Sequence, residues 1–294
     1  MNDQATQLRQ IVKEKQPNIN NNTPSAKIIT VTSGKGGVGK SNTVVNLALS
    51  LKEKGKEVVI LDADLGLANI EVLLGVIPRY NLSNVLTGNK TITEIIEENE
   101  DGIKFISGGS GINELMFLNK EQITKFANSV AELERIADYI LIDTSAGITD
   151  AVLSFCRLAH EVIFITTPEP TSITDAYALI KTFQSDSDID LPSIKIIVNK
   201  TESSKEAEEV YRKLANVCKH FLNMEIEYLG CVLFDYNVMK AAKIQEPICK
   251  SFPKSKASND YRKIVNTLTD LKPKENTPAK GNLFKQVLKM FSKH

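Results

Sequence analysis

A glycine-rich segment with two lysines lies directly after an apolar run near the start of the sequence. Residues 34–41 read Gly-Lys-Gly-Gly-Val-Gly-Lys-Ser and satisfy the phosphate-binding pattern G-x-x-x-x-G-K-[ST]. Glycines let the backbone curl so that several N–H groups face one phosphate, and the helix that follows adds positive potential at its N-terminus. In such a loop Lys40 pairs with the β- and γ-phosphates, and the Ser41 hydroxyl binds Mg²⁺. The nucleotide-binding residues predicted here are Gly34, Lys35, Gly36, Gly37, Val38, Gly39, Lys40, Ser41 and Asn42.

Acidic residues follow two other apolar runs, and their spacing suits a metal-assisted reaction. Asp62 and Asp64 come after Val58–Leu61, and because they are two residues apart their side chains point the same way beyond a strand's carboxyl end. Asp143 comes after Tyr139–Ile142, where a carboxylate can hold Mg²⁺ through water. The alternative for Asp62 and Asp64 is that they cap the next turn.

The elements that must position these residues alternate between short β-branched runs and longer helical patterns. Expected strands are 27–32, 58–61, 104–107, 139–142, 162–166, 194–198 and 229–233, and expected helices are 41–54, 120–137, 151–159, 173–183 and 203–221. Nearly continuous apolar strands separated by helices indicate a parallel sheet that is covered on both faces. We therefore predict a doubly wound α/β domain with a mainly parallel sheet over residues 27–271. With the glycine-rich loop, this is the architecture of a P-loop NTPase domain.

Two linkers separate this domain from the ends of the chain. Residues 16–26 are uncharged, rich in asparagine and contain two prolines, so they have too little to bury and predict a flexible connection. They tether a weakly helical N-terminal head, residues 1–15. A second linker, residues 272–281, leads to a short tail, residues 282–294.

The tail has the pattern of a basic amphipathic helix. Its apolar residues Leu283, Phe284, Val287, Leu288, Met290 and Phe291 fall on one helical arc, and Lys285, Lys289 and Lys293 recur on the opposite side. This stripe suits an anionic membrane surface, where each lysine contributes ~1 kcal/mol. The alternative is a last helix that docks on the core.

Composition limits the remaining classes of function. The 294 residues contain 36 Lys plus Arg and 36 Asp plus Glu, so a nucleic-acid role driven by bulk charge is not expected. The cysteines, Cys156, Cys218, Cys231 and Cys249, form no C-x-x-C pair and are expected as buried thiols of a reducing cytosol. The N-terminus has no apolar signal core, and no stretch reaches the ~18 apolar residues of a membrane span. We expect a cytoplasmic protein.

The position of Lys35 early in K-G-G-x-G-K-S resembles the deviant Walker A motif of the family that contains the division-site ATPase MinD and the partition ATPase ParA. The resemblance implies a doubly wound ATPase in which Lys35 reaches the partner's nucleotide across a homodimer, so that hydrolysis depends on dimerisation. It also implies that Asp64 orients the attacking water, that Asp62 lies nearer the metal, and that residues 144–147 form switch II. Ser41 stands where threonine is commoner in the family.

Two strand ends extend the resemblance. Asn199 follows the run Ile196–Val198 at the position of the family's adenine-reading residue, and its amide offers both a donor and an acceptor to the base. A plain strand-end turn is the alternative. Leu233–Asp235 stands where related proteins often carry a proline-containing segment, so no adenine lid is assigned.

The head carries the most specific resemblance. Residues 3–9 match D-Q-A-x-x-L-R, the motif of the FlhG (FleN or YlxH) flagellar-number regulators within the MinD-like family, through Asp3, Gln4, Ala5, Leu8 and Arg9. The resemblance implies that this segment binds the GTPase FlhF and stimulates its hydrolysis. The alternative is that Asp3 only caps a surface helix.

The leading hypothesis is a Mg²⁺-dependent ATPase that dimerises around ATP and limits or patterns flagella by acting on FlhF and the flagellar C-ring. In the ATP state it is expected at the inner face of the cell membrane, with Lys35, Lys40 and Asp64 as catalytic residues. The alternatives are a MinD-type division-site ATPase, a ParA-like DNA partition ATPase and an iron-sulfur carrier scaffold.

Overall fold

The computed structural model of the chain describes residues 26–64, 69–109, 128–185 and 191–270. The predictions about the head, about residues 16–25 of the first linker, about the second linker and about the tail lie outside the described residues.

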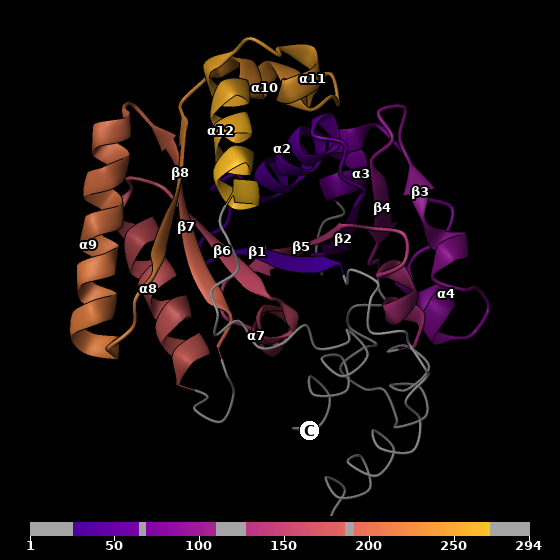
Figure 1. The fold of residues 1–294 in the computed structure, drawn as a ribbon, viewed down its shortest axis with the longest axis horizontal. Helices are drawn as coiled ribbons and strands as arrows, with labels where there is room; N and C mark the ends of the chain where they lie inside the picture. Colours follow the sequence, from indigo (N-terminus) through magenta and orange to yellow (C-terminus); the bar gives the residue numbers. More distant parts are fainter. Residues whose placement is uncertain (1–25, 65–68, 110–127, 186–190, 271–294) are drawn as a thin grey trace, which may run out of the picture.

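An eight-stranded sheet forms the centre of the described part, in the order β3-β4-β2-β5-β1-β6-β7-β8 (Figure 1). The strands are β1 (Lys27–Ser33), β2 (Val58–Ala63), β3 (Glu97–Glu98), β4 (Lys104–Ser107), β5 (Tyr139–Ala146), β6 (Glu161–Thr166), β7 (Ser193–Thr201) and β8 (Glu227–Leu233). Their pairings are parallel except for the antiparallel pair β3–β4. The predicted doubly wound fold with a mainly parallel sheet is confirmed.

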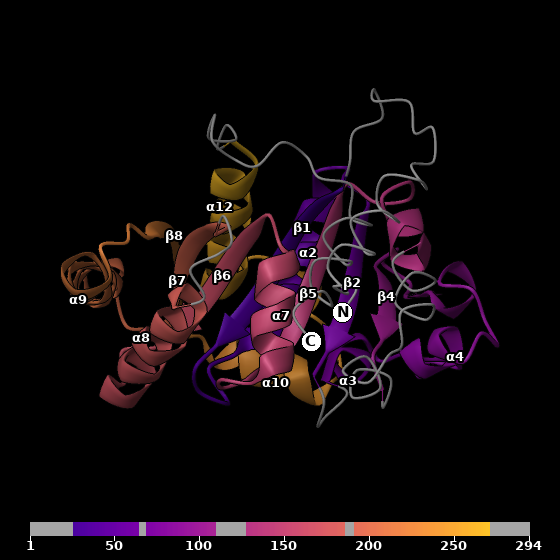
Figure 2. The same cartoon turned by 90° about the horizontal axis from the view of Figure 1, so that it is seen from below.

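Helices cover both faces of this sheet, as Figures 1 and 2 show from two directions. They are α2 (Lys40–Glu53), α3 (Asn69–Leu74), α4 (Leu82–Leu86), α7 (Asp150–Leu158), α8 (Pro170–Gln184), α9 (Ser204–Leu222), α10 (Tyr236–Lys243), α11 (Ile248–Ser251), α12 (Lys256–Asp270) and the 3₁₀ turn η1 (Thr93–Ile95). One core packs α2 and α12 against the sheet, and the other packs α7, α8 and α9 against its opposite face. Strands buried on both faces explain their continuous apolar sequences.

The predicted strands are all present, but four of them end later than expected, β1 by a single residue. β2, β5 and β7 continue through Asp62, Asp143 and Asn199, which the sequence placed just beyond the strands. The extra residues still pair with their neighbours, and Asp62 lies opposite Asp143 in the register of β2 and β5. The polar residues are therefore fixed by the sheet itself.

The helices differ from the prediction in several places, since α3, α4, α10, α11 and α12 were not predicted. The described part of the predicted helix 120–137 is helical only from 128 to 133 and ends in a tight turn, because the chain must enter β5. The sequence analysis placed no helix after β8, yet α12 buries Ala257, Tyr261, Ile264, Val265 and Leu268 at helical spacing. This spacing was readable from the sequence.

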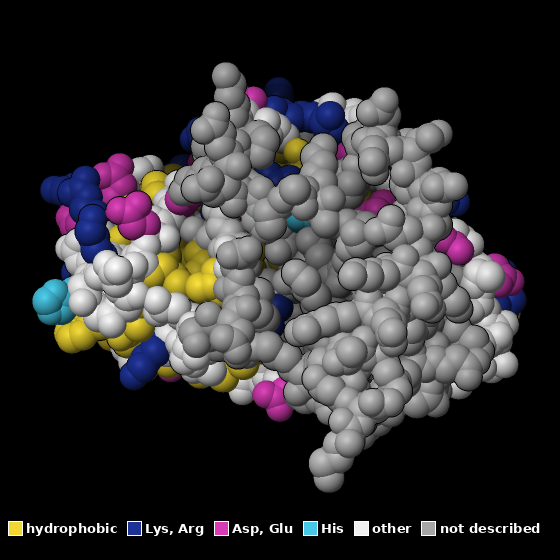
Figure 3. Space-filling view, turned by 60° about the horizontal axis from the view of Figure 1, so that its bottom comes forward, with side chains coloured by type: hydrophobic (Ala, Val, Ile, Leu, Met, Phe, Trp, Pro, Cys, Tyr) yellow, Lys and Arg dark blue, Asp and Glu magenta, His cyan; other side chains and the backbone are white. Residues whose placement is uncertain are grey.

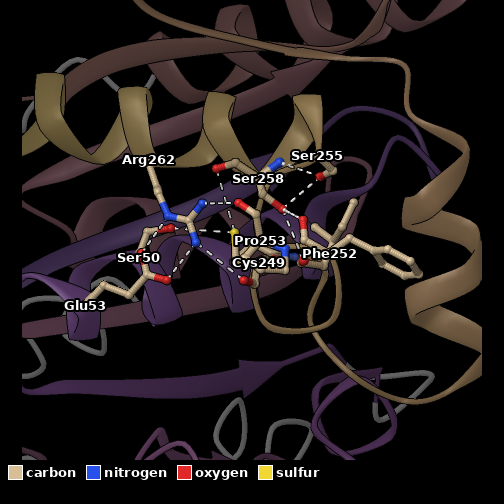
Figure 4. A network of polar contacts seen from close by, with 10 residues as sticks. Ser50, Glu53, Cys249, Phe252, Pro253, Ser255, Ser258 and Arg262 are labelled. Carbon is tan, nitrogen blue, oxygen red and sulfur yellow. Dashed lines mark hydrogen bonds and ion pairs between the residues drawn. The ribbon is translucent and has the colours of Figure 1, made fainter.

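A polar network holds α11 and α12 against the helix that follows the glycine-rich loop (Figure 4). The guanidinium of Arg262 donates to both carboxylate oxygens of Glu53, at 2.7 and 2.8 Å, a bidentate geometry. It also donates to the Cys249 carbonyl at 3.4 Å. The N–H of Cys249 in turn donates to the Asn46 side chain at 3.0 Å. The C-terminal helices thus support α2 along its length.

Candidate nucleotide-binding site

The glycine-rich loop joins β1 to α2 at the carboxyl edge of the sheet, where β1 lies between β5 and β6. In an open α/β sheet such a point of reversed strand order is where ligands bind. Gly37 and Gly39 adopt left-handed backbone angles, with φ of +75° and +93°. A Cβ at Gly39 would lie 2.4 Å from Nδ2 of Asn199, so only glycine fits there. No side chain caps the N-terminus of α2 and its first turn is free of acids, which leaves its N–H groups for an anion.

Lys40 and Asp143 form a buried ion pair behind this loop. The Lys40 Nζ lies 3.2 Å from Oδ1 of Asp143, and the two side chains are 8% and 0% exposed. The second oxygen of Asp143 is buried and has no hydrogen-bond partner among the described residues. Burial raises the pKa of Asp143, and Lys40 opposes that rise. The second oxygen of Asp143 is therefore the acceptor of this pair that is left unused in the described part.

Asp62 brings a second buried carboxylate beside the first. It accepts hydrogen bonds from the N–H groups of Asp64 at 3.1 Å and Ile70 at 3.3 Å. Burial, and then the neighbouring charge of Asp143, raises the pKa of Asp62 to about 7. In the described part Lys40 forms an ion pair with Asp143 and none with Asp62, so one ammonium group faces two neighbouring carboxylates.

Asp64 lies at the same edge and is half-buried. Its carboxylate accepts a hydrogen bond of 3.4 Å from the side chain of Asn69, at the start of α3. The structure therefore brings Lys40, Asp62, Asp64 and Asp143 to one edge of the sheet, as the sequence predicted.

These residues fit Mg²⁺ held together with a nucleotide. Among the described residues, no three His, Cys, Asp or Glu side chains are arranged to hold a metal by themselves. Mg²⁺ is usually bound through only one or two protein groups together with phosphates and waters. Ser41 and the free oxygen of Asp143 can supply those groups.

Lys35 lies on the exposed rim of the loop and is held within its own chain. Its Nζ donates to Oε2 of Glu169 at 2.6 Å and to Oγ1 of Thr171 at 2.9 Å. The bond from Lys35 lowers the pKa of Glu169, which precedes α8. Sequence reasoning missed Glu169 and Thr171, because no local pattern pairs them with a loop more than a hundred residues away.

Asn199 is buried at the end of β7 and contacts the loop directly. Its Nδ2 donates to the Val38 carbonyl at 2.7 Å, and its Oδ1 accepts the N–H of Lys200 at 2.8 Å. The ammonium group of Lys200 donates to the Gly37 carbonyl at 2.7 Å, a contact that sequence reasoning missed. One N–H and one lone pair of Asn199 remain for a base.

The other predicted features are simpler to place. Cys156, Cys218 and Cys249 are buried, Cys231 is half-buried, and in the described part all four are unpaired thiols. None of the described helices combines the length and apolar character needed to cross a bilayer.

On the face shown in Figure 3, basic and acidic side chains are interspersed over the α8 and α9 side, next to exposed hydrophobic ones.

The family is decided by a match over most of the chain. The model of the ParA family, described as NUBPL iron-transfer P-loop NTPase, matches residues 25–269. The chain belongs to the ParA/MinD family of P-loop ATPases. Within this family it is 38% identical over 239 residues to the antiactivator FleN of Pseudomonas aeruginosa, covering 81% of this chain and 85% of FleN. The predicted resemblance to the FlhG group is confirmed.

Further relatives place this ParA/MinD-type ATPase near both flagellar and division proteins. It is 39% identical over 235 residues to the flagellum site-determining protein YlxH of Helicobacter pylori, covering 79% of this chain and 78% of YlxH. It is 31% identical to the septum site-determining protein MinD of Bacillus subtilis, over 82% of this chain and 88% of that MinD. A solved MinC:MinD cell division complex from Aquifex aeolicus matches with a TM-score of 0.66 and 26% identity, over 84% of this chain and 97% of that one.

Proposed function

We propose that this ATPase is a Mg²⁺-dependent switch that pairs with a second copy around ATP and regulates the number and placement of flagella. The observation that carries the proposal is the buried pair of Lys40 and Asp143 behind a glycine loop, with a free carboxylate oxygen and Asp62 beside it. The similarity to FleN and YlxH supplies the flagellar assignment.

The chain's own groups account for each part of the reaction. Loop N–H groups and the Lys40 ammonium bind the β- and γ-phosphates, and Ser41 and Asp143 hold Mg²⁺. Mg²⁺ held by Ser41 and Asp143 would supply positive charge to the phosphate oxygens. The half-buried Asp64 orients a water for attack, and Asp62 hydrogen-bonds water near the metal. Asn199 uses its remaining donor and acceptor to bind the edge of adenine.

Lys35 makes hydrolysis depend on a second copy. Its partners, Glu169 and Thr171, lie on its own chain and are exposed. An exposed ion pair of this kind contributes only ~0.2–1 kcal/mol, so it is readily exchanged. In the proposed dimer Lys35 leaves Glu169 and meets the partner's nucleotide, where it stabilises the negative charge of the transition state.

The head provides the proposed link to flagellar assembly. Gln4, Ala5 and Leu8 form part of the D-Q-A-x-x-L-R motif, which we propose binds FlhF and stimulates its GTPase activity. The folded domain is proposed to act on components of the flagellar C-ring.

Measuring GTP hydrolysis by FlhF tests this link. We expect deletion of residues 1–22, or Gln4→Ala, to abolish the stimulation and leave ATP hydrolysis unchanged. Gln7→Ala is the matched control, because position 7 is not specified by the motif. Stimulation that survives the deletion would contradict the role proposed for the head. If the full chain gave no stimulation, that would favour the second candidate, a MinD-type division-site ATPase, which the similarity to MinD of Bacillus subtilis supports.

The tail is proposed to bind the inner membrane surface in the ATP state. Two tails on one dimer bind more tightly than one through avidity, so nucleotide state sets location. We expect deletion of residues 282–294 to abolish cosedimentation with anionic liposomes and to leave ATP hydrolysis in solution intact. Replacing Lys285, Lys289 and Lys293 with Gln should weaken binding about a hundredfold, since each lysine contributes ~1 kcal/mol. Unchanged lipid binding by both variants would contradict the proposal.

A further inference from the structure

Strand β7 ends in a bulge that places Lys200 against the glycine loop. The register of β7 with β8 shifts between Asn199 and Thr201, and Lys200 has a left-handed backbone with φ of +58°. A non-glycine residue in this conformation costs about 1 kcal/mol or more, and it persists where its surroundings hold it. Bulges beside active sites serve to redirect a side chain.

Successive residues of β7 hold successive carbonyls of the loop. Asn199 donates to the Val38 carbonyl and Lys200 donates to the Gly37 carbonyl, each at 2.7 Å. In a trans peptide the C=O of one residue and the N–H of the next point in opposite directions. The hydrogen bond from Lys200 to the Gly37 carbonyl therefore turns the Val38 N–H away from Lys200. In the same way, the hydrogen bond from Asn199 to the Val38 carbonyl turns the Gly39 N–H away from Asn199.

On its Gly37 side this peptide has little else to fix it, although the Val38 side chain on its other side is buried, at 3% exposure. Gly37 has a left-handed φ of +75°, and nothing lies within 4 Å of the position that its Cβ would occupy. Glycine peptides in open space rotate readily, so the direction of the Val38 N–H depends on an outside partner. Lys200 supplies one.

We propose that Lys200 is a positioning residue of the phosphate site, which holds the Gly37–Val38 peptide so that its N–H faces the phosphates before nucleotide binds. This inference rests on the proposed binding of ATP. An exposed lysine bonded to a carbonyl adds little to folding, so stability alone does not explain the strained backbone at Lys200. Preorganisation of a donor for an anion does explain it.

The experiment compares Lys200→Met, which keeps the stem and loses the donor, with Lys200→Arg, which restores one. Lys200→Gly relieves the left-handed strain and also loses the donor, so it separates backbone strain from the hydrogen bond. Lys205→Met is the control, since Lys205 is an exposed lysine at the start of α9. The measurements are the Kd for a fluorescent ADP, KM and kcat for ATP, and the melting temperature of the free protein.

We expect Lys200→Met and Lys200→Gly to raise the Kd for ADP and the KM for ATP about three- to tenfold, the effect of losing one solvent-exposed hydrogen bond. Melting temperature and kcat should stay near wild type, Lys200→Arg should recover most of the affinity, and Lys205→Met should match wild type. Wild-type affinity in Lys200→Met or Lys200→Gly would overturn the inference and leave the proposed function standing. A wild-type protein that bound no nucleotide would overturn both.

Discussion

The amino ends and the carboxyl ends of the parallel strands form two opposite edges of the central sheet. These amino and carboxyl edges differ in how their buried charges are balanced. At the amino edge, neighbouring strands present Lys27, Glu161, Lys195 and Glu227, which alternate in sign. Lys27 lies 2.9 Å from Glu161, and Lys195 lies 3.7 Å from Glu161 and 2.8 Å from Glu227. One oxygen of Glu161 has no hydrogen bond in the described part, but two ammonium groups lie near that carboxylate.

At the carboxyl edge the balance is incomplete. Asp62 and Asp143 lie side by side in the register of β2 and β5, and only Lys40 forms a buried ion pair there in the described part. The same parallel sheet thus carries a neutral row of charges at one edge and an acidic pair short of a cation at the other. The comparison teaches that the charges at the first edge balance within the fold, whereas those at the second edge leave a carboxylate without a cation in the described part.

Replacing Lys40, the cation of the carboxyl edge, should have the largest effect of the changes considered, a loss of ATP hydrolysis. We expect Lys40→Ala to lower ATP hydrolysis about a thousandfold, or about 4 kcal/mol, because the cation for both the phosphates and the acids is lost. The check is steady-state hydrolysis together with circular dichroism to confirm folding. Lys52→Ala, on the same helix but paired with Glu57 at the surface, is the control and should keep wild-type activity. Near-normal hydrolysis by Lys40→Ala would contradict the functional role that we give to the carboxyl edge.

Neutralising Asp62 should stabilise the free protein above pH 7. Its pKa is raised from 3.8 to about 7 in the folded state by burial and Asp143, so the fold binds this proton more tightly than the unfolded chain. The stability that this proton gives is complete below about pH 4 and is lost as pH rises through 7.

At pH 8 we therefore expect Asp62→Asn to raise the free energy of unfolding by about 2–3 kcal/mol. The gain is less than the full shift because the Asn amide can accept only one of the two backbone hydrogen bonds that Asp62 accepts. Urea unfolding at pH 4 and pH 8 measures it, with exposed Asp150 replaced by Asn as the control. A gain that is equal at both pH values would contradict the charge imbalance.

Neutralising Glu161 should destabilise the free protein, the opposite of the change expected at Asp62. Glu161→Gln removes the carboxylate between two lysines, and Lys195 is only 3% exposed. We expect a loss of about 1–2 kcal/mol in the free energy of unfolding, because Lys195 keeps Glu227 as a partner. The KM and kcat for ATP should not change. A loss of ATP affinity without a loss of stability would show that the amino edge also serves the nucleotide.

Glu169→Gln should have the smallest effect on stability. The ion pair with Lys35 is exposed, so the free energy of unfolding should change by less than about 0.5 kcal/mol. Freed from Glu169, Lys35 should let the dimer form at lower ATP concentration. Analytical ultracentrifugation across an ATP series measures this, and a shift to higher ATP would contradict it.

The sequence predicted every strand except the two-residue β3, the helices α2, α7, α8 and α9, and the residues of the carboxyl edge, because their signals are local. The glycine loop, the acids after apolar runs and Asn199 each carry a pattern that a few neighbouring residues define. The contacts of Lys35 with Glu169 and of Lys200 with Gly37 were not predictable in this way. They join side chains to distant segments, and they depend on a bulge and on helix placement that no short pattern encodes.

The proposed switch requires that ATP, and not ADP, pair two chains through Lys35. Size-exclusion chromatography with multi-angle light scattering tests this on Asp64→Ala, which should retain ATP because it removes water orientation and not phosphate binding. We predict twice the chain mass of 32.5 kDa with Mg²⁺ and ATP, and the single mass with ADP. Adding Lys35→Gln should restore the single mass with ATP. A single mass for Asp64→Ala with ATP, or a dimer that survives Lys35→Gln, would contradict the account.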